Sequence, residues 1–301
     1  GSPLALAQAQ ETRQRLMVAH DLPEAAFEIM VIKTTGDDRT LIDADRPLKE
    51  IGNKGLFTKE IEEAMVAGRI DIAVHSMKDM PTEQPEGLTL GCYLPREDTR
   101  DAVISHNARG IADLPAGAVV GSSSLRRRAQ LLDRRPDLKV VEFRGNVQTR
   151  LKKLQDGVAD CTFLAMAGLR RLGLSDLATG GIAPEDMLPA IAQGAIGIEW
   201  RMADTATAEL LAPLHDTPTG QRLAAERAFL AALDGSCETP IAGLALIEGD
   251  EIWLRGEILR PDGSQKLATE GRALLADGAA LGRDLGAELR GRAPAGFFDW
   301  M

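Results

Sequence analysis

The sequence has few aromatic residues, few cysteines and no long apolar run. Aromatics are 4% of the 301 residues, so the stacking platform of a nucleic-acid-binding domain is not expected. The three cysteines have no CxxC spacing and fit neither a disulfide framework nor a zinc site, which favours a reduced, cytoplasmic protein without a metal. No 18 consecutive residues are apolar, and the first residues, Gly1 to Leu4, lack the basic start of a signal peptide.

The net charge is −10, which argues against nucleic acid or an anionic membrane as a partner. Strand-like and helix-like segments alternate along most of the chain, and a meander-like stretch follows near the C-terminus. We therefore expect an α/β protein with two lobes and a smaller α+β C-terminal domain. The expected boundaries are 1–95 with 195–213 for domain 1, 100–190 for domain 2 and 217–301 for domain 3.

Local patterns predict where the elements lie. Ser2 can cap a helix that has Pro3 at its first position, and Gly68 and Gly157 can end later helices. The expected helices start at residues 3, 58, 125 and 147 and cover 217–233 and 277–290. The expected strands are 27–33, 70–75, 118–120, 138–143, 161–167, 194–200, 241–247, 251–259 and 265–275.

Positive charge is concentrated between Gly121 and Arg171, where twelve cations and five anions give a local net charge of +7. Four of these cations fall where strands pass into helices, a position at which α/β proteins bind anions. They are Arg126, Arg127, Arg144 and Arg150. Phosphate and carboxylate both fit this pattern, although the absence of a P-loop disfavours a nucleoside triphosphate. Six of the other eight are expected on solvated faces: Arg128, Arg134, Arg135, Lys139, Lys152 and Lys153.

Two further residues are candidates for chemistry. Asp79 follows the strand that ends near His75, where a carboxylate could stabilise a cation, shuttle protons or simply bond to the backbone of a turn. Cys237 lies in a polar turn after a glycine, unlike Cys92 and Cys161, which sit among apolar residues and are expected to be buried. His75 is expected to pack or form a hydrogen bond within its strand.

Taken together, the chain resembles the porphobilinogen deaminase family over nearly its whole length, with the motifs in the family's order. These motifs are Ser2-Pro3-Leu4-Ala5, Lys54-Gly55-Leu56-Phe57, His75-Ser76-Met77-Lys78-Asp79, Gly121-Ser122-Ser123-Ser124-Leu125-Arg126-Arg127, Arg144-Gly145-Asn146-Val147-Gln148-Thr149-Arg150-Leu151, Ala167-Gly168-Leu169-Arg170-Arg171-Leu172-Gly173, Gln193-Gly194-Ala195-Ile196-Gly197-Ile198-Glu199 and the turn around Cys237.

The resemblance implies two lobes like those of periplasmic binding proteins and a C-terminal domain that carries a dipyrromethane cofactor, joined by a thioether to Cys237. It implies a transferase of tetrapyrrole and haem biosynthesis that is a cytoplasmic monomer. Such an enzyme condenses four porphobilinogen molecules head to tail, losing ammonia each time, and water then releases hydroxymethylbilane. The many carboxylates of the growing chain would account for the arginines.

The resemblance also implies roles for individual residues. Asp79 is the expected catalytic residue. The expected cofactor-binding residues, besides Cys237, are Ser76, Lys78, Ser123, Ser124, Arg126, Arg127, Arg150 and Gly168. The expected substrate-binding residues are Ser2, Gln8, Arg144, Arg150, Arg171 and Gln193. The expected lid covers residues 49–57 and includes Lys49, Lys54 and Phe57.

Two features depart from the family pattern. Family members usually begin with a strand and an arginine before the serine that matches Ser2, and the sequence starts at Gly1. The segment 36–48 is also longer than expected. The alternative hypothesis is a non-catalytic, two-lobed protein that binds a small anion. A nucleic-acid-binding function would rest only on the local charge of +7.

Overall fold

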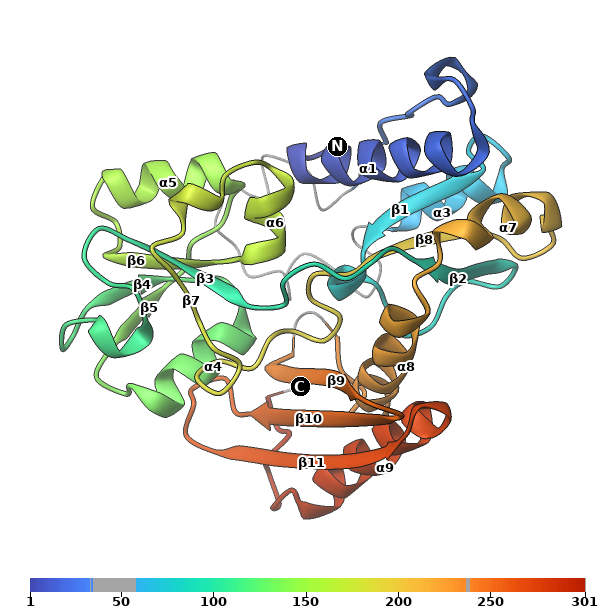
Figure 1. Ribbon diagram of the computed structural model, residues 1–301. Helices are drawn as coiled ribbons and strands as arrows, with labels where there is room; N and C mark the ends of the chain where they lie inside the picture. Colours follow the sequence, from blue (N-terminus) through green and yellow to red (C-terminus); the bar gives the residue numbers. More distant parts are fainter. Residues whose placement is uncertain (33, 35–57, 237–238, 301) are drawn as a thin grey trace.

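The computed structural model describes residues 1–32, 34, 58–236 and 239–300, which form three sheets with helices packed against them (Figure 1). We call the three parts of the structure, each built around one of these sheets, lobe 1, lobe 2 and the C-terminal domain. The predicted mixture of two α/β lobes with a smaller C-terminal domain is confirmed. The domain boundaries given above stay a prediction.

Lobe 1 contains an antiparallel sheet with the strand order β1-β8-β2. Its central strand comes from much later in the chain than its neighbours, so the chain leaves lobe 1 and returns to it (Figure 1). The strands are β1 (Ile72–Ser76), β2 (Leu88–Tyr93) and β8 (Ile196–Arg201), and the helices are α1 (Pro3–His20), α3 (Lys59–Val66) and α7 (Thr205–Leu211).

Lobe 2 contains a five-stranded mixed sheet with the order β5-β4-β6-β3-β7. Strand β4 pairs in parallel with β5 and β6, whereas β3 is antiparallel to β6 and β7. The strands are β3 (Asp101–Ser105), β4 (Val119–Gly121), β5 (Lys139–Val141), β6 (Cys161–Ala165) and β7 (Gly180–Gly181). The helices are α4 (Leu125–Arg134), α5 (Val147–Gln155) and α6 (Met166–Arg171). Helices α4 and α5 each follow a strand, so their N-termini lie at the carboxyl ends of parallel strands.

The C-terminal domain is an antiparallel meander of three strands packed on two helices (Figure 1). The strands are β9 (Ile241–Glu248), β10 (Glu251–Leu259) and β11 (Lys266–Leu274), and the helices are α8 (Thr217–Ala232) and α9 (Gly278–Arg292). Its core includes Phe229 and Leu254, and it continues to Met77 and Met80 of lobe 1. The predicted meander and both predicted helices are confirmed.

Two segments connect the lobes, 94–100 and 188–195, and they run side by side. The amide of Glu97 donates to the carbonyl of Gly194 at 3.1 Å, and the amide of Leu94 donates to Ile196 at the same distance. Gly194 has φ +87°, and a Cβ there would lie 2.6 Å from the carbonyl oxygen of Glu97. Only glycine permits this approach of the two backbones. We call 94–100 and 188–195 the crossover segments.

The structure also corrects several predictions. The predicted strand 27–33 is wrong for its described part, 27–32, which belongs to no sheet. A β-strand needs a neighbouring strand to pair with as well as apolar residues. Here a cavity of about 530 Å³ lies between this segment and β1. Strand β6 ends at Ala165 because Met166 begins α6, so the predicted strand 161–167 was too long. Strands β2 and β3 were not predicted.

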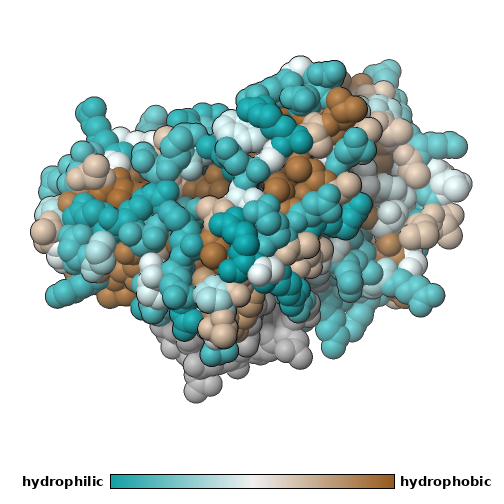
Figure 2. All heavy atoms as spheres, turned by 90° about the horizontal axis from the view of Figure 1, so that it is seen from below, coloured by the Kyte–Doolittle hydropathy of each residue, from teal (hydrophilic) through white to brown (hydrophobic). Residues whose placement is uncertain are grey.

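Hydrophobic residues on the face shown in Figure 2 form small groups separated by hydrophilic ones. No helix within the described residues has both the length and the apolar content needed to cross a lipid bilayer.

Candidate functional site

The first part of the site is the carboxyl end of β1. Ser76 ends the strand, and a short 3-10 helix, η4 (Met77–Asp79), follows. Met77 is buried in the core and fixes this turn, while Lys78 is half-buried and Asp79 is exposed. The side-chain amide of Gln8, on α1, donates to the Ser76 hydroxyl at 2.8 Å. Two of the expected residues, Gln8 and Ser76, therefore touch one another next to Lys78 and Asp79.

A residue of the C-terminal domain stabilises the turn that follows Asp79. Arg227 of α8 donates to the backbone carbonyls of Met80, Pro81 and Thr82, with the shortest bond, to Pro81, at 2.6 Å. Burial lowers the pKa of Arg227. Sequence patterns gave no signal for this contact, because the two segments are far apart in the chain.

The second part of the site is the start of α4. The hydroxyl oxygen of Ser124 caps the helix by accepting from the amide of Arg127, and that of Ser123 accepts from the amide of Phe143 at 2.8 Å. A hydroxyl that accepts one bond still has its own proton to donate. Both serines can therefore donate to an anion at the N-terminus of α4, where the helix dipole also favours negative charge.

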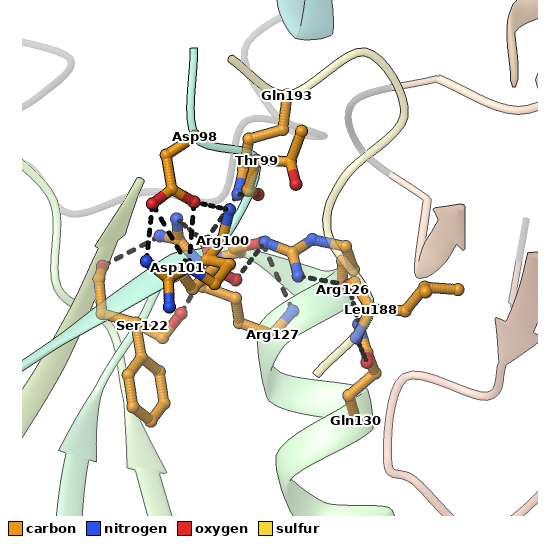
Figure 3. A network of polar contacts seen from close by, with 12 residues as sticks. Asp98, Thr99, Arg100, Asp101, Ser122, Arg126, Arg127, Gln130, Leu188 and Gln193 are labelled. Atoms are coloured by element: carbon orange, nitrogen blue, oxygen red, sulfur yellow. Dashed lines mark hydrogen bonds and ion pairs between the residues drawn. The ribbon is translucent and has the colours of Figure 1, made fainter. Parts of the chain in front are cut away.

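Arg126 and Arg127, in the first turn of α4, share one buried carboxylate, that of Asp101 (Figure 3). Each guanidinium donates to a different Asp101 oxygen, at 2.8 Å in both cases. Gln193, from the other crossover segment, also donates to Asp101, at 2.9 Å. Sequence analysis missed Asp101, since an aspartate at the start of an apolar strand carries no distinctive signal.

Charge balance in this cluster favours an additional anion. Burial alone would raise the pKa of Asp101, yet Arg126 and Arg127 together hold it well below its usual range. The single carboxylate thus stays charged and offsets one of the two arginines. Burial also lowers the pKa of Lys78, which Arg127 depresses further and Asp79 raises. Lys78 of lobe 1 therefore lies close enough to Arg127 of lobe 2 for their charges to interact.

Arg144 and Arg150 flank the turn between β5 and α5. The Nε of Arg150 donates to the carbonyl of Gly145 at 2.9 Å, and burial, with the nearby charge of Arg127, lowers the pKa of Arg150 to about 10. Arg144 is 9% exposed, and its side chain makes no hydrogen bond or ion pair with the part of the chain described. Gly145 has φ +115°, and a Cβ there would overlap the Thr149 side chain at 2.6 Å.

Several other expected residues lie where the two lobes meet. Arg171 donates to Glu11 of α1 at 3.3 Å and to the carbonyl of Gly194 at 3.1 Å. Gly168 on α6 faces Leu4 on α1, since a Cβ on the glycine would be 3.6 Å from that side chain. Ser2 is exposed and caps α1 through a bond from Ala5, as predicted.

The remaining expected residues lie outside the described part of the chain. They are Cys237 and the three lid residues Lys49, Lys54 and Phe57. By contrast, Cys92 and Cys161 are buried, as predicted, and burial raises the pKa of each thiol to about 12.

His75 is buried, but its hydrogen bond is not within its own strand as expected. Its Nε2 lies 2.9 Å from a carboxylate oxygen of Glu199 on β8, and both side chains are buried. This pair joins two strands of the lobe 1 sheet.

The described residues fit a ligand that carries several carboxylates. The Nε of Arg127 is buried and has no hydrogen-bond partner, and the side chains of Lys78 and Arg144 have no carboxylate partner within the described segments. The buried donors of Arg127 and Arg144 are costly unless an acceptor meets them. A carboxylate group placed between Lys78 and Arg127 would supply one.

Two family models match the chain. One, described as "Porphobilinogen deaminase, dipyromethane cofactor binding domain", matches residues 1–209. The other, "Porphobilinogen deaminase, C-terminal domain", matches residues 221–291. A curated porphobilinogen deaminase from Paracoccus denitrificans (strain Pd 1222) is 68% identical over 300 residues, covering 100% of this chain and 95% of that protein.

Two solved structures of lower similarity match part of the chain. A probable amino-acid ABC transporter extracellular-binding protein from Bacillus subtilis is 13% identical, with a TM-score of 0.38, over 74% of this chain and 86% of that chain. The VFT2 domain of BvgS from Bordetella pertussis is 16% identical, with a TM-score of 0.38, over 68% of this chain and 75% of that chain.

Proposed function

Because the chain belongs to the porphobilinogen deaminase family, we propose that the cations around Asp101 hold the carboxylates of its dipyrromethane cofactor while Asp79 acts on the reacting pyrrole units. The chain's activity is that of hydroxymethylbilane synthase, a transferase of tetrapyrrole biosynthesis whose substrate is porphobilinogen. The alternative of a non-catalytic anion-binding protein is not favoured, because the match to an enzyme covers the whole chain.

The observation that supports this assignment is the excess of buried positive charge where the lobes meet. The charge of Arg127 acts on both Lys78 and Arg150, and Asp101 offsets only part of this positive charge. The dipyrromethane supplies the primer to which porphobilinogen units are joined. Its proposed contacts are Ser76, Lys78, Ser123, Ser124, Arg126, Arg127, Arg150 and the backbone of Gly168, and Cys237 is the proposed point of attachment.

Asp79 is the proposed catalytic residue. Its carboxylate is exposed at the carboxyl end of β1 and makes no hydrogen bond or ion pair with other described residues. It is therefore available to accept hydrogen bonds from pyrrole N–H groups and to stabilise the positive charge that develops as ammonia leaves.

The incoming substrate would meet a separate set of residues. We assign to it Ser2, Gln8, Arg144, Arg150, Arg171 and Gln193, and we assign the lid to residues 49–57. Arg144 makes no hydrogen bond or ion pair with the described residues and could bind a substrate carboxylate, whereas Arg171 and Gln193 already bond to the protein and would position the site. We also propose that the enzyme is a cytoplasmic monomer that needs neither membrane nor nucleic acid.

Intact-protein mass spectrometry and an ammonia assay test the function together. The purified full chain should exceed its sequence mass by one dipyrromethane and should release ammonia from porphobilinogen. A preparation that releases ammonia at the unmodified sequence mass would contradict covalent attachment. A preparation that binds porphobilinogen reversibly without releasing ammonia would contradict the transferase.

A further inference from the structure

We propose that Asp101 is a positioning residue that aims Arg126 and Arg127 at the cofactor, an inference that rests on the function proposed above. Asp101 is completely buried at the first position of β3, directly after the crossover segment 94–100. Its two oxygens accept three hydrogen bonds, one each from Arg126, Arg127 and Gln193 (Figure 3). These hydrogen bonds all come from protein side chains, so we infer that it acts through the arginines.

Each arginine is fixed at two points, and Asp101 is one of them for both. Arg126 also donates to the carbonyl of Leu188 at 2.8 Å, and Arg127 donates to the carbonyl of Phe163 at 2.9 Å. Two contacts define the plane of a guanidinium group, because its donors are arranged in a rigid fork. With its plane fixed in this way, Arg127 has a buried Nε that finds no hydrogen-bond partner among the described residues. A ligand carboxylate that reaches this donor would supply the missing acceptor.

Asp101 also makes it possible for two buried cations to lie side by side. Without a carboxylate between them, Arg126 and Arg127 would repel each other in a site of low polarity. One negative charge against two positive charges keeps the pair together and leaves one positive charge for the ligand. A neutral residue at position 101 would therefore release the arginines, even though the local positive charge would increase.

The third donor connects this arrangement to the second crossover segment. The side-chain amide of Gln193 donates to Thr99 at 2.8 Å as well as to Asp101, and Arg96 donates to the carbonyl of Gln193 at 2.9 Å. The two crossover segments are thus tied together at the residue that orients the arginines. We infer that a change at Gln193 acts on cofactor loading mainly through Asp101.

The experiment compares Asp101→Asn with a control in the same sheet, Thr162→Val. Thr162 is completely buried and donates to the carbonyl of Gly121 at 2.7 Å, but it forms no hydrogen bond with either arginine. Full chains would be purified and their loaded fraction measured by intact mass, with melting temperatures recorded in parallel. We expect Asp101→Asn to lower the loaded fraction about tenfold or more. Thr162→Val should stay loaded even if it melts at a lower temperature.

Two more variants keep the test decisive if Asp101→Asn does not fold. Asp101→Glu retains the charge and should recover much of the loading. Gln193→Met removes one of the three donors to Asp101. This substitution should change the loaded fraction less in the Asp101→Glu variant than in the parent, because both substitutions act on the same carboxylate. In the loaded fraction of each variant, KM for porphobilinogen should rise more than kcat falls, since the catalytic Asp79 is unchanged.

The outcomes separate the two proposals. A parent chain without added mass overturns the proposed function and the inference with it. The positioning role alone is overturned if the parent and Asp101→Asn are equally loaded. It is also overturned if Asp101→Asn and Thr162→Val lose the same loaded fraction at matched melting temperature. Additive effects of the changes at positions 101 and 193 would overturn the coupling between them.

Discussion

The guanidinium of Arg96 and the carboxylate of Glu226 form a fully buried ion pair with two contacts, at 2.6 and 3.0 Å. Glu226 also accepts the amides of Ala192 and Ala245, at 2.7 and 2.9 Å. One carboxylate on α8 therefore joins both crossover segments to the C-terminal domain. The crossover segments between the lobes are therefore anchored by the C-terminal domain, which also carries the proposed attachment residue, Cys237.

Replacing Glu226 with alanine should destabilise the fold strongly. Removing one partner of a buried pair leaves an uncompensated charge on Arg96 and two unpaired amides, at a cost of about 3–5 kcal/mol. Urea denaturation would measure the loss. The control is Glu248→Ala, which breaks an exposed pair with Arg272 and should cost less than about 1 kcal/mol. Similar losses in the two variants would contradict this account.

Asp79→Asn should reduce turnover without reducing stability. The side chain is exposed and unbonded in the described structure, so folding should change by about 0.5 kcal/mol or less. Losing the carboxylate that stabilises the developing cation should lower kcat by roughly 10²–10³-fold. Steady-state ammonia release and thermal melting give the two values. Glu86→Gln, a nearby exposed change, should alter neither, and a matched loss of stability and rate in Asp79→Asn would indicate a structural role.

Cys237→Ser should abolish the added mass, because a serine hydroxyl cannot form the thioether. Intact mass should then equal the sequence mass, and turnover should be lost. Cys161→Ala provides the comparison: it removes a buried thiol of lobe 2 and should retain the cofactor. Turnover that survives in Cys237→Ser would show that the primer is held elsewhere.

Cys92 and Cys161 should resist alkylation in the folded protein. Burial raises the pKa of each thiol to about 12, so at pH 8 almost no thiolate is present at either position. Peptide mapping after brief treatment with iodoacetamide should leave both unmodified, and denaturation should make both reactive. Rapid labelling of either in the native state would contradict the packing described.

Glu257 should make stability depend on pH. Burial between β10 and α4 raises its pKa above the ordinary 4.5, although Lys266, Arg134 and Arg126 oppose the shift and Asp133 adds to it. The folded state then favours the neutral acid, so this contribution is complete below about pH 4.5 and is lost as pH rises through the folded pKa.

Glu257→Gln, which cannot ionise, should therefore gain stability relative to the parent as pH rises. Urea midpoints for both proteins between about pH 4.5 and 8 test the sign. A constant difference across this range would mean that Glu257 titrates normally. Glu251→Gln, an exposed change on the same strand, should show no such trend.

The elements predicted best are those specified by neighbours in the sequence. Ser2 and Pro3 begin α1 as expected, since a cap and the residues it serves are only three positions apart. The meander of the C-terminal domain was also predicted, because its turns and its pairing are local. The segment 27–32 was predicted wrongly as a strand because pairing depends on a distant partner, which no local pattern contains.

The sequence by itself determined the chemistry available to the protein: the arginines at strand ends, the carboxylate Asp79, the thiol Cys237 and the motifs that indicate the family. Tertiary structure alone decided which charges meet. Asp101 and Gln193 lie 92 positions apart, and each also lies far from Arg126, yet the three form one cluster. Folding brings them together because a buried charge needs a partner, and that requirement is satisfied in space rather than along the chain.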